Sequence, residues 1–112
     1  MKTSELEGAE LDYWVARITK TDGRLDELPS KHNKNVFNFY SPSTDWQQGG
    51  PLIEEYGLEI KPYTYTHKDA AVISWQALSL FATPPAQVEY GPTPLIAAMR
   101  CLVSSKFGDS VG

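Results

Sequence analysis

The residue types that carry out serine-based hydrolysis all occur in the chain, but their spacing does not assemble them. The candidates for nucleophile, base and orienting acid are Ser41, Ser43, Asp45, His67 and Asp69. Both serines flank a proline, where turns and helix caps account for them, and neither lies in the strand-turn-helix elbow that exposes a nucleophile. The sequence therefore predicts a protein that is not an enzyme.

Metal ligands and phosphate-binding loops also lack the required spacing. No two of His32, His67 and Cys101 lie four residues apart or in a Cys-x-x-Cys pair. Gly49-Gly50-Pro51 has no lysine after it, so it is not a nucleoside triphosphate loop, and it is typical of a helix stop followed by a helix start. We expect no metal site and no cofactor.

One set of residues combines planar rings, amides and a helix start. Its members are Tyr40, Ser43, Thr44, Asp45, Trp46, Gln47, Gln48, Tyr90, Thr93 and Arg100. Aromatic rings stack on planar ligands, while amides hydrogen-bond to their edges. The free N–H groups of the helix expected after Thr93 suit a phosphate or carboxylate, and Arg100 could add a charge-assisted pair. This set predicts a small-molecule site, with Trp46 as its best candidate.

Charge and composition restrict the partners. The chain has 112 residues, and its 14 acidic against 10 Lys and Arg side chains give a net charge of -4. Nucleic acids need a basic patch, and no Lys/Arg cluster occurs, so a nucleic-acid partner is disfavoured. Four lysines could still gather on one face: Lys31, Lys34, Lys61 and Lys68. No run of about 18 apolar residues occurs, and we expect no membrane partner and a cytoplasmic location.

Periodicity and capping chemistry predict the elements of the first half. Ser4-x-x-Glu7 is a capping box, and apolar residues at helical spacing predict a helix to about residues 17–19. Residues 24–35 are expected to form a loop, and 36–40 a short strand. Ser41 is the expected cap of a first short helix that Gly49-Gly50 ends, and 51–56 is expected to form a second.

The second half supplies most of the expected core, because only Glu89 is charged between residues 70 and 99. Residues 58–66 alternate like a strand, 67–69 form a turn, and 71–81 are long enough for the central strand. Prolines keep residues 83–92 from forming a helix or a central strand. Thr93 caps a last helix, with Pro94 at its first position and Gly108 after its end.

These elements predict a single α+β domain over residues 1–112. A small antiparallel sheet of about three strands should carry an N-terminal and a C-terminal helix on one face, with short helices in the 41–57 connection. The core should take the aromatic residues Trp14, Phe37, Phe39, Trp75, Phe81 and Phe107. An exposed sheet edge and a small core leave room for a homo-oligomer.

Three blocks of the chain resemble one protein family. SELEGAELDYWVARI, FYSPSTDWQQGGPLIEEYG and GPTPLIAAMRCLVSSKFGD are similar to the NinX family of lambdoid phages and prophages, and they cover roughly half of the chain. Residues 20–36 and 82–90 depart from the family pattern. The resemblance implies a phage-encoded accessory protein acting in the bacterial cytoplasm, and it implies no reaction.

Together these observations give two functional hypotheses. The first is a phage accessory protein with a counter-defence role, which binds and sequesters a small nucleotide-derived signalling molecule of the host. The alternative is a protein–protein interaction module that inhibits or adapts a host or phage protein, because exposed Trp and Tyr side chains also dominate interface energetics.

Overall fold

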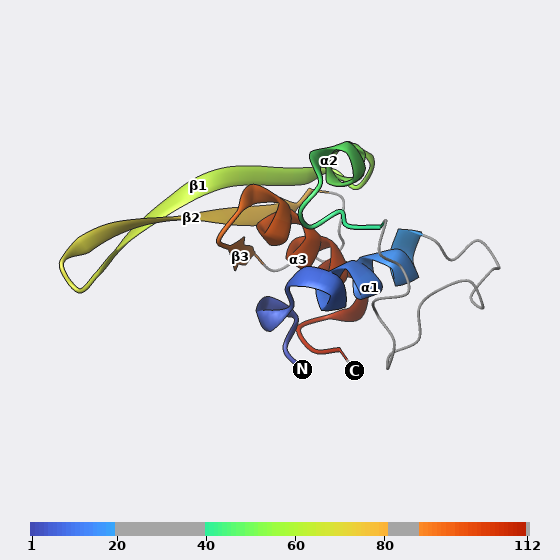
Figure 1. Ribbon diagram of the computed structural model, residues 1–112, viewed down its shortest axis with the longest axis horizontal. Helices are drawn as coiled ribbons and strands as arrows, with labels where there is room; N and C mark the ends of the chain where they lie inside the picture. The colour runs from blue at the N-terminus through green and yellow to red at the C-terminus, as the bar shows by residue number, and fades with distance from the viewer. Residues whose placement is uncertain (20–39, 81–87, 112) are drawn as a thin grey trace.

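The computed structural model describes residues 1–19, 40–80 and 88–111 (Figure 1). Its elements are η1 (Thr3–Glu5), α1 (Gly8–Thr19), α2 (Trp46–Glu55), β1 (Leu58–His67), β2 (Ala70–Ser79), β3 (Glu89–Gly91) and α3 (Pro94–Phe107). The strands form an antiparallel sheet in the order β1-β2-β3. The predicted α+β class is confirmed. Within the described residues, no helix is long and apolar enough to cross a bilayer.

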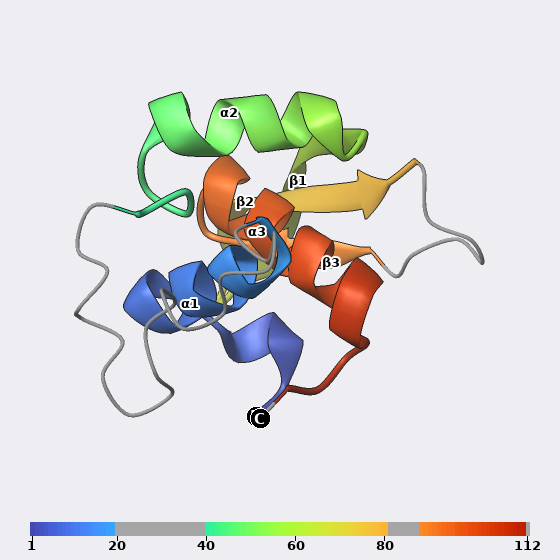
Figure 2. The same ribbon diagram turned by 90° about the vertical axis from the view of Figure 1, so that its right-hand side faces the viewer.

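Helix α3 is the centre of the molecule. It packs against all three strands on one side and against α1 and α2 on the others, so α1 lies on the same side of the sheet with α3 between (Figures 1 and 2). Its sequence begins with the predicted Thr93 cap, whose hydroxyl accepts from Ile96 N at 3.1 Å, and ends at Gly108 with φ 86°. The largest fully buried core side chains are Leu6, Leu11, Val15, Met99, Leu102 and Val103.

Strands β1 and β2 form a long hairpin that extends past the helices as a two-stranded arm (Figure 1). Lys68 and Asp69 make its two-residue turn at φ 50° and 65°, which is the backbone of the primed turns that match strand twist. The arm gives the molecule a long dimension of 48 Å against 29 and 27 Å. Most side chains from residue 61 to 71 are exposed.

The N-terminal cap was predicted at the wrong place. Ser4 lies in η1, and α1 begins only at Gly8. Long-range pairing with the other end of the chain accounts for the difference. Thr3 N donates to Asp109 O at 3.0 Å, and Thr3 Oγ1 donates to Gly108 O at 2.8 Å. These bonds hold the two termini side by side (Figure 1).

The 41–57 connection contains one helix rather than two. Asp45, not Ser41, is the N-cap of α2, and Gly49-Gly50 lies inside the helix instead of ending it. A Cβ on Gly49 would lie 2.4 Å from Pro42 O and 2.7 Å from Leu95 Cδ2. The glycine therefore permits a close approach to the preceding loop and to α3, a role that its sequence position does not reveal.

The third strand is also not the predicted one. Residues 36–39 and Phe81 lie outside the described residues, and Tyr40 belongs to no strand. The strand beside β2 is β3, which follows the proline-rich stretch and lies at the sheet edge. A Cβ on Gly91 in β3 would lie 2.6 Å from Ala97 N, so glycine lets β3 pack closely on α3. Phe107 was predicted in the core but is 40% exposed, and it contacts the ring of Trp14.

Candidate functional site

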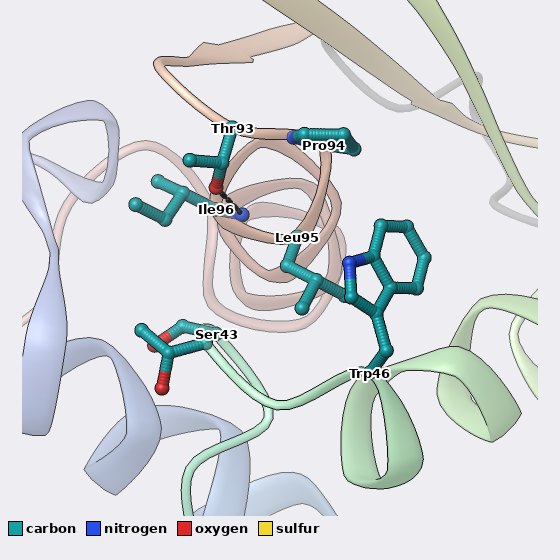
Figure 3. A pocket seen from close by; sticks show the side chains of 7 residues that line it. Ser43, Trp46, Thr93, Pro94, Leu95 and Ile96 are labelled. Atoms are coloured by element: carbon teal, nitrogen blue, oxygen red, sulfur yellow. Dashed lines mark hydrogen bonds between the residues drawn. The ribbon is translucent and has the colours of Figure 1, made fainter.

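A pocket of about 200 Å³ lies where the loop before α2 meets the start of α3. Its lining residues are Ser43, Thr44, Trp46, Thr93, Pro94, Leu95 and Ile96. In Figure 3, which looks along α3, the Trp46 indole stands beside Leu95 and the Ser43 loop lies on the other side. Two segments about 50 residues apart in sequence thus bring together four members of the predicted set.

The start of α3 supplies the polar end of this pocket. Pro94 at the first helical position has no N–H, and the N–H groups of Ile96 and Ala97 are donated to the side chain and backbone oxygens of Thr93. Leu95 N is therefore the first-turn donor left for a ligand, together with the positive end of the helix dipole. No charged side chain lines the pocket.

Trp46 provides the apolar wall. It is the first residue of α2 and remains 56% exposed, so a large part of its side chain is open to a ligand. Asp45 fixes its position by capping the helix: Asp45 Oδ1 accepts from Gln47 N at 2.9 Å. The side chain of Gln48 completes this turn by donating to Asp45 Oδ2 at 3.1 Å.

Buried polar contacts hold the Ser43 side of the pocket. Ser43 N donates to Asp12 Oδ1 on α1 at 2.9 Å. Burial raises the pKa of Asp12, and this backbone hydrogen bond opposes the rise. Ser43 is 1% exposed, and its Oγ is a buried polar atom without a hydrogen bond among the described residues.

The remaining predicted residues lie elsewhere. Tyr40 is partly buried against the core, its hydroxyl is hydrogen-bonded to Thr19, and burial raises its pKa. Gln47 is exposed on α2, and Gln48 Oε1 accepts from Ser41 N at 2.8 Å. Of these side chains, only Gln47 projects freely into solvent near Trp46, and none of them lines the pocket.

Tyr90 and Arg100 are separated from the pocket by their places in the fold. Tyr90 pairs with Gln76, and its side chain therefore points away from α3. On that face its ring centroid lies 5.2 Å from the ring centroid of Tyr63. Arg100 is 9% exposed, and its guanidinium donates to Leu6 O at 2.7 Å and to Tyr90 O at 2.8 Å. Burial lowers the pKa of Arg100, which the nearby Glu7 and Glu89 raise.

Sequence reasoning missed the apolar part of the lining, Pro94, Leu95 and Ile96. The sequence did contain a signal for these residues. Thr93 was predicted to cap a helix, and the first turn of a helix directly follows its cap. A second, larger pocket of about 470 Å³ near the termini contains only Tyr90 of the predicted set. Its lining mixes both charge signs, with Lys2, Glu89 and Asp109.

The catalytic and metal-binding candidates do not gather around this pocket. His67 ends β1 at the tip of the arm, far from the loop that carries Ser43 (Figure 1). In the part of the chain that the structure describes, no group of three His, Cys, Asp or Glu side chains could hold a metal ion. Cys101 is buried in α3, and burial raises its pKa to about 12.

A model of a known protein family matches the chain. The family described as Bacteriophage P22, NinX matches residues 2–106. The match includes the first two blocks noted in the sequence completely and the third through Lys106. No curated protein matches the chain.

Proposed function

The chain belongs to the NinX family of bacteriophage P22 and is a phage accessory protein; from this premise, we propose that it binds and sequesters a small nucleotide-derived signalling molecule of the host. Such a counter-defence role requires the protein to bind the signalling molecule but not to convert it. The observation that carries the proposal is the pocket in which an open Trp46 ring faces the start of α3. A planar ring stacked on Trp46 could place a polar group at Leu95 N.

Pocket size limits what one chain can enclose. Pockets for whole ligands usually measure about 300–1,000 Å³, and this one measures about 200 Å³. It therefore suits one planar ring, such as a nucleobase, with the rest of the ligand outside.

Calorimetry with cyclic dinucleotides and ADP-ribose derivatives tests the proposal. Trp46→Ala should weaken binding by about 5-fold to 150-fold, since stacking on an aromatic ring contributes about 1–3 kcal/mol per base. Tyr63→Ala is the matched control, because Tyr63 is 42% exposed but lies on the sheet face away from the pocket. The proposal would be overturned if none of these ligands gave heat or a thermal shift, or if both variants lost the same amount of binding affinity.

A specific observation favours the second candidate function, a protein–protein interaction module. Tyr63, Tyr65 and Tyr90 form an exposed cluster on the sheet face opposite α3, with ring centroids 6.1 and 5.2 Å apart. Tyrosine is enriched at interface hot spots. Recovery from infected cells separates the two functions: capture predicts a co-purifying small molecule, whereas the module predicts a stoichiometric protein that Tyr63→Ala releases.

A further inference from the structure

The two long strands of the arm differ at their free edges. Beyond α3 the arm has two strands and exposed faces, and an isolated two-stranded hairpin is marginally stable in water. The β1 edge carries Glu59, Lys61 and Pro62, which are typical devices against edge-to-edge pairing. The β2 strand, AAVISWQALS, carries no charged residue and no proline. Its edge is therefore unprotected wherever β3 does not cover it.

The register identifies the unpaired backbone groups on β2. Pro62 has no N–H, so its nitrogen must point away from β2, and its partner Trp75 must point its backbone groups toward β3. Counting from the two-residue turn gives the same result, because the His67–Ala70 pair next to the turn exchanges hydrogen bonds. Every second residue of β2 therefore directs its backbone N–H and C=O groups toward the free edge.

Only a short stretch of this edge is open. Strand β3 pairs with Trp75, Gln76 and Ala77, and the chain then turns away into α3. By the alternation above, Ala71 and Ile73 direct their N–H and C=O groups outward, and no described residue bonds to these groups. The edge therefore presents two donors and two acceptors. Beside them Ile73 is 65% exposed, the most exposed large apolar side chain among the described residues.

We propose that a second copy of this chain occupies the edge, with the two β2 strands antiparallel and Val72 on the two-fold axis. Ala71 of one copy then lies opposite Ile73 of the other, and the two pairs exchange four hydrogen bonds, which satisfies the outward groups of Ala71 and Ile73 in both copies. The two Ile73 side chains each cover an Ala71 on the same face. The pairing brings no like charges together, because the paired segment is uncharged.

This arrangement turns two arms into one four-stranded sheet. The second strand follows on from β3 along the same edge of β2, so the turn of each copy reaches the end of β3 in the other. That end leads directly into Thr93 and the start of α3. The proposal goes beyond ligand capture and does not depend on it.

Proline substitutions at one cross-strand pair provide a matched test. Thr64 and Ile73 are partners in the register, and both direct their N–H groups outward, on opposite edges of the arm. Sedimentation should show a wild-type dimer that Ile73→Pro weakens at least about 10-fold, since two interchain bonds of about 1 kcal/mol each are lost. Thr64→Pro should leave it intact. A monomeric wild type at millimolar concentration, or a dimer that survives Ile73→Pro, would overturn the proposal.

Cysteine crosslinking tests the register without proline. Val72 and its symmetry mate form a pair without mutual hydrogen bonds, whose Cα atoms lie about 4.5 Å apart, within disulfide reach. Val72→Cys should oxidise to a covalent dimer. Tyr65→Cys, the position directly across the hairpin, should not, and the buried Cys101 of the wild type provides the background. Preferential crosslinking of Tyr65→Cys would assign the interface to β1 and reject β2.

Discussion

The two adjacent glycines of α2 should respond in opposite directions to the same substitution. Gly50 meets nothing closer than Trp46 Cε3 at 4.0 Å, so an added methyl group fits there. Alanine in a helix interior is about 0.8–1.0 kcal/mol more favourable than glycine. Because Pro51 follows and its Cδ crowds a Cβ on the preceding helical residue, Gly50→Ala should raise the free energy of unfolding by only part of that amount.

Gly49→Ala gains the same helix propensity but creates overlap. The new Cβ would lie 2.4 Å from a backbone oxygen, Pro42 O, which cannot move like the end of a side chain, and 2.7 Å from Leu95 Cδ2. Overpacking of this kind costs about 1–3 kcal/mol, so after the gain in helix propensity a net loss of up to about 2 kcal/mol remains. The two variants should differ by about 1–3 kcal/mol, or roughly 5–15 °C in Tm for a domain of this size.

Urea unfolding followed by far-UV circular dichroism measures this difference directly. Equal m-values in both variants would show that stability changed rather than the extent of unfolding. If Gly49→Ala proved as stable as Gly50→Ala, the close packing of α2 on the Pro42 loop would be refuted. The pocket would then lose the contact that places Trp46 beside Leu95.

Three further predictions concern buried polar groups. Burial raises the folded-state pKa of Asp12 above its ordinary 3.8, so wild-type stability should fall as pH rises from that value through the raised pKa; Asp12→Asn should remove this part of the slope in pH-dependent urea unfolding. Arg100→Met leaves Leu6 O and Tyr90 O without their donor and should cost about 3 kcal/mol in the same assay, whereas an unchanged midpoint would contradict the assigned bonds. Because burial raises the pKa of Cys101 to about 12, Ellman's reagent should label it only on unfolding, and fast labelling of the native protein would be inconsistent with its position.

Local chemistry was sufficient to predict those elements whose ends are determined by their own residues. Thr93 and Pro94 start α3, and its last turn runs into Gly108, as expected from capping alone. The β1–β2 hairpin follows from alternation on either side of a two-residue turn. The start of α1 was wrong because it depends on Thr3 pairing with residues more than 100 positions away. One sequence gives no signal for such a contact.

The candidate site shows the same division. Trp46 and Thr93 were chosen for their chemistry, and the pocket does bring their segments together. Arg100 was chosen because it follows the start of the last helix closely enough to add a charge-assisted pair, yet its donors are used by two backbone carbonyls of distant segments. Tyr90 was chosen for its nearness in sequence to Thr93, but strand alternation puts its ring on the other face of the sheet. The type of a residue shows which contacts its side chain can make, but the fold determines which partner it contacts.

The stretch from residue 70 to 99, in which only Glu89 is charged, owes its low charge to two different physical causes. In α3, the residues before Arg100 carry no charge because the helix is buried against every other layer, and Arg100 itself is hydrogen-bonded to Leu6 O. At the start of β2, Ala70, Ala71 and Ile73 are exposed, so burial within one chain does not explain why charge is absent there. An edge strand in water usually carries a lysine or proline that blocks pairing. The absence of both at this edge, beside a β1 edge that has both, is what an edge selected to pair would require.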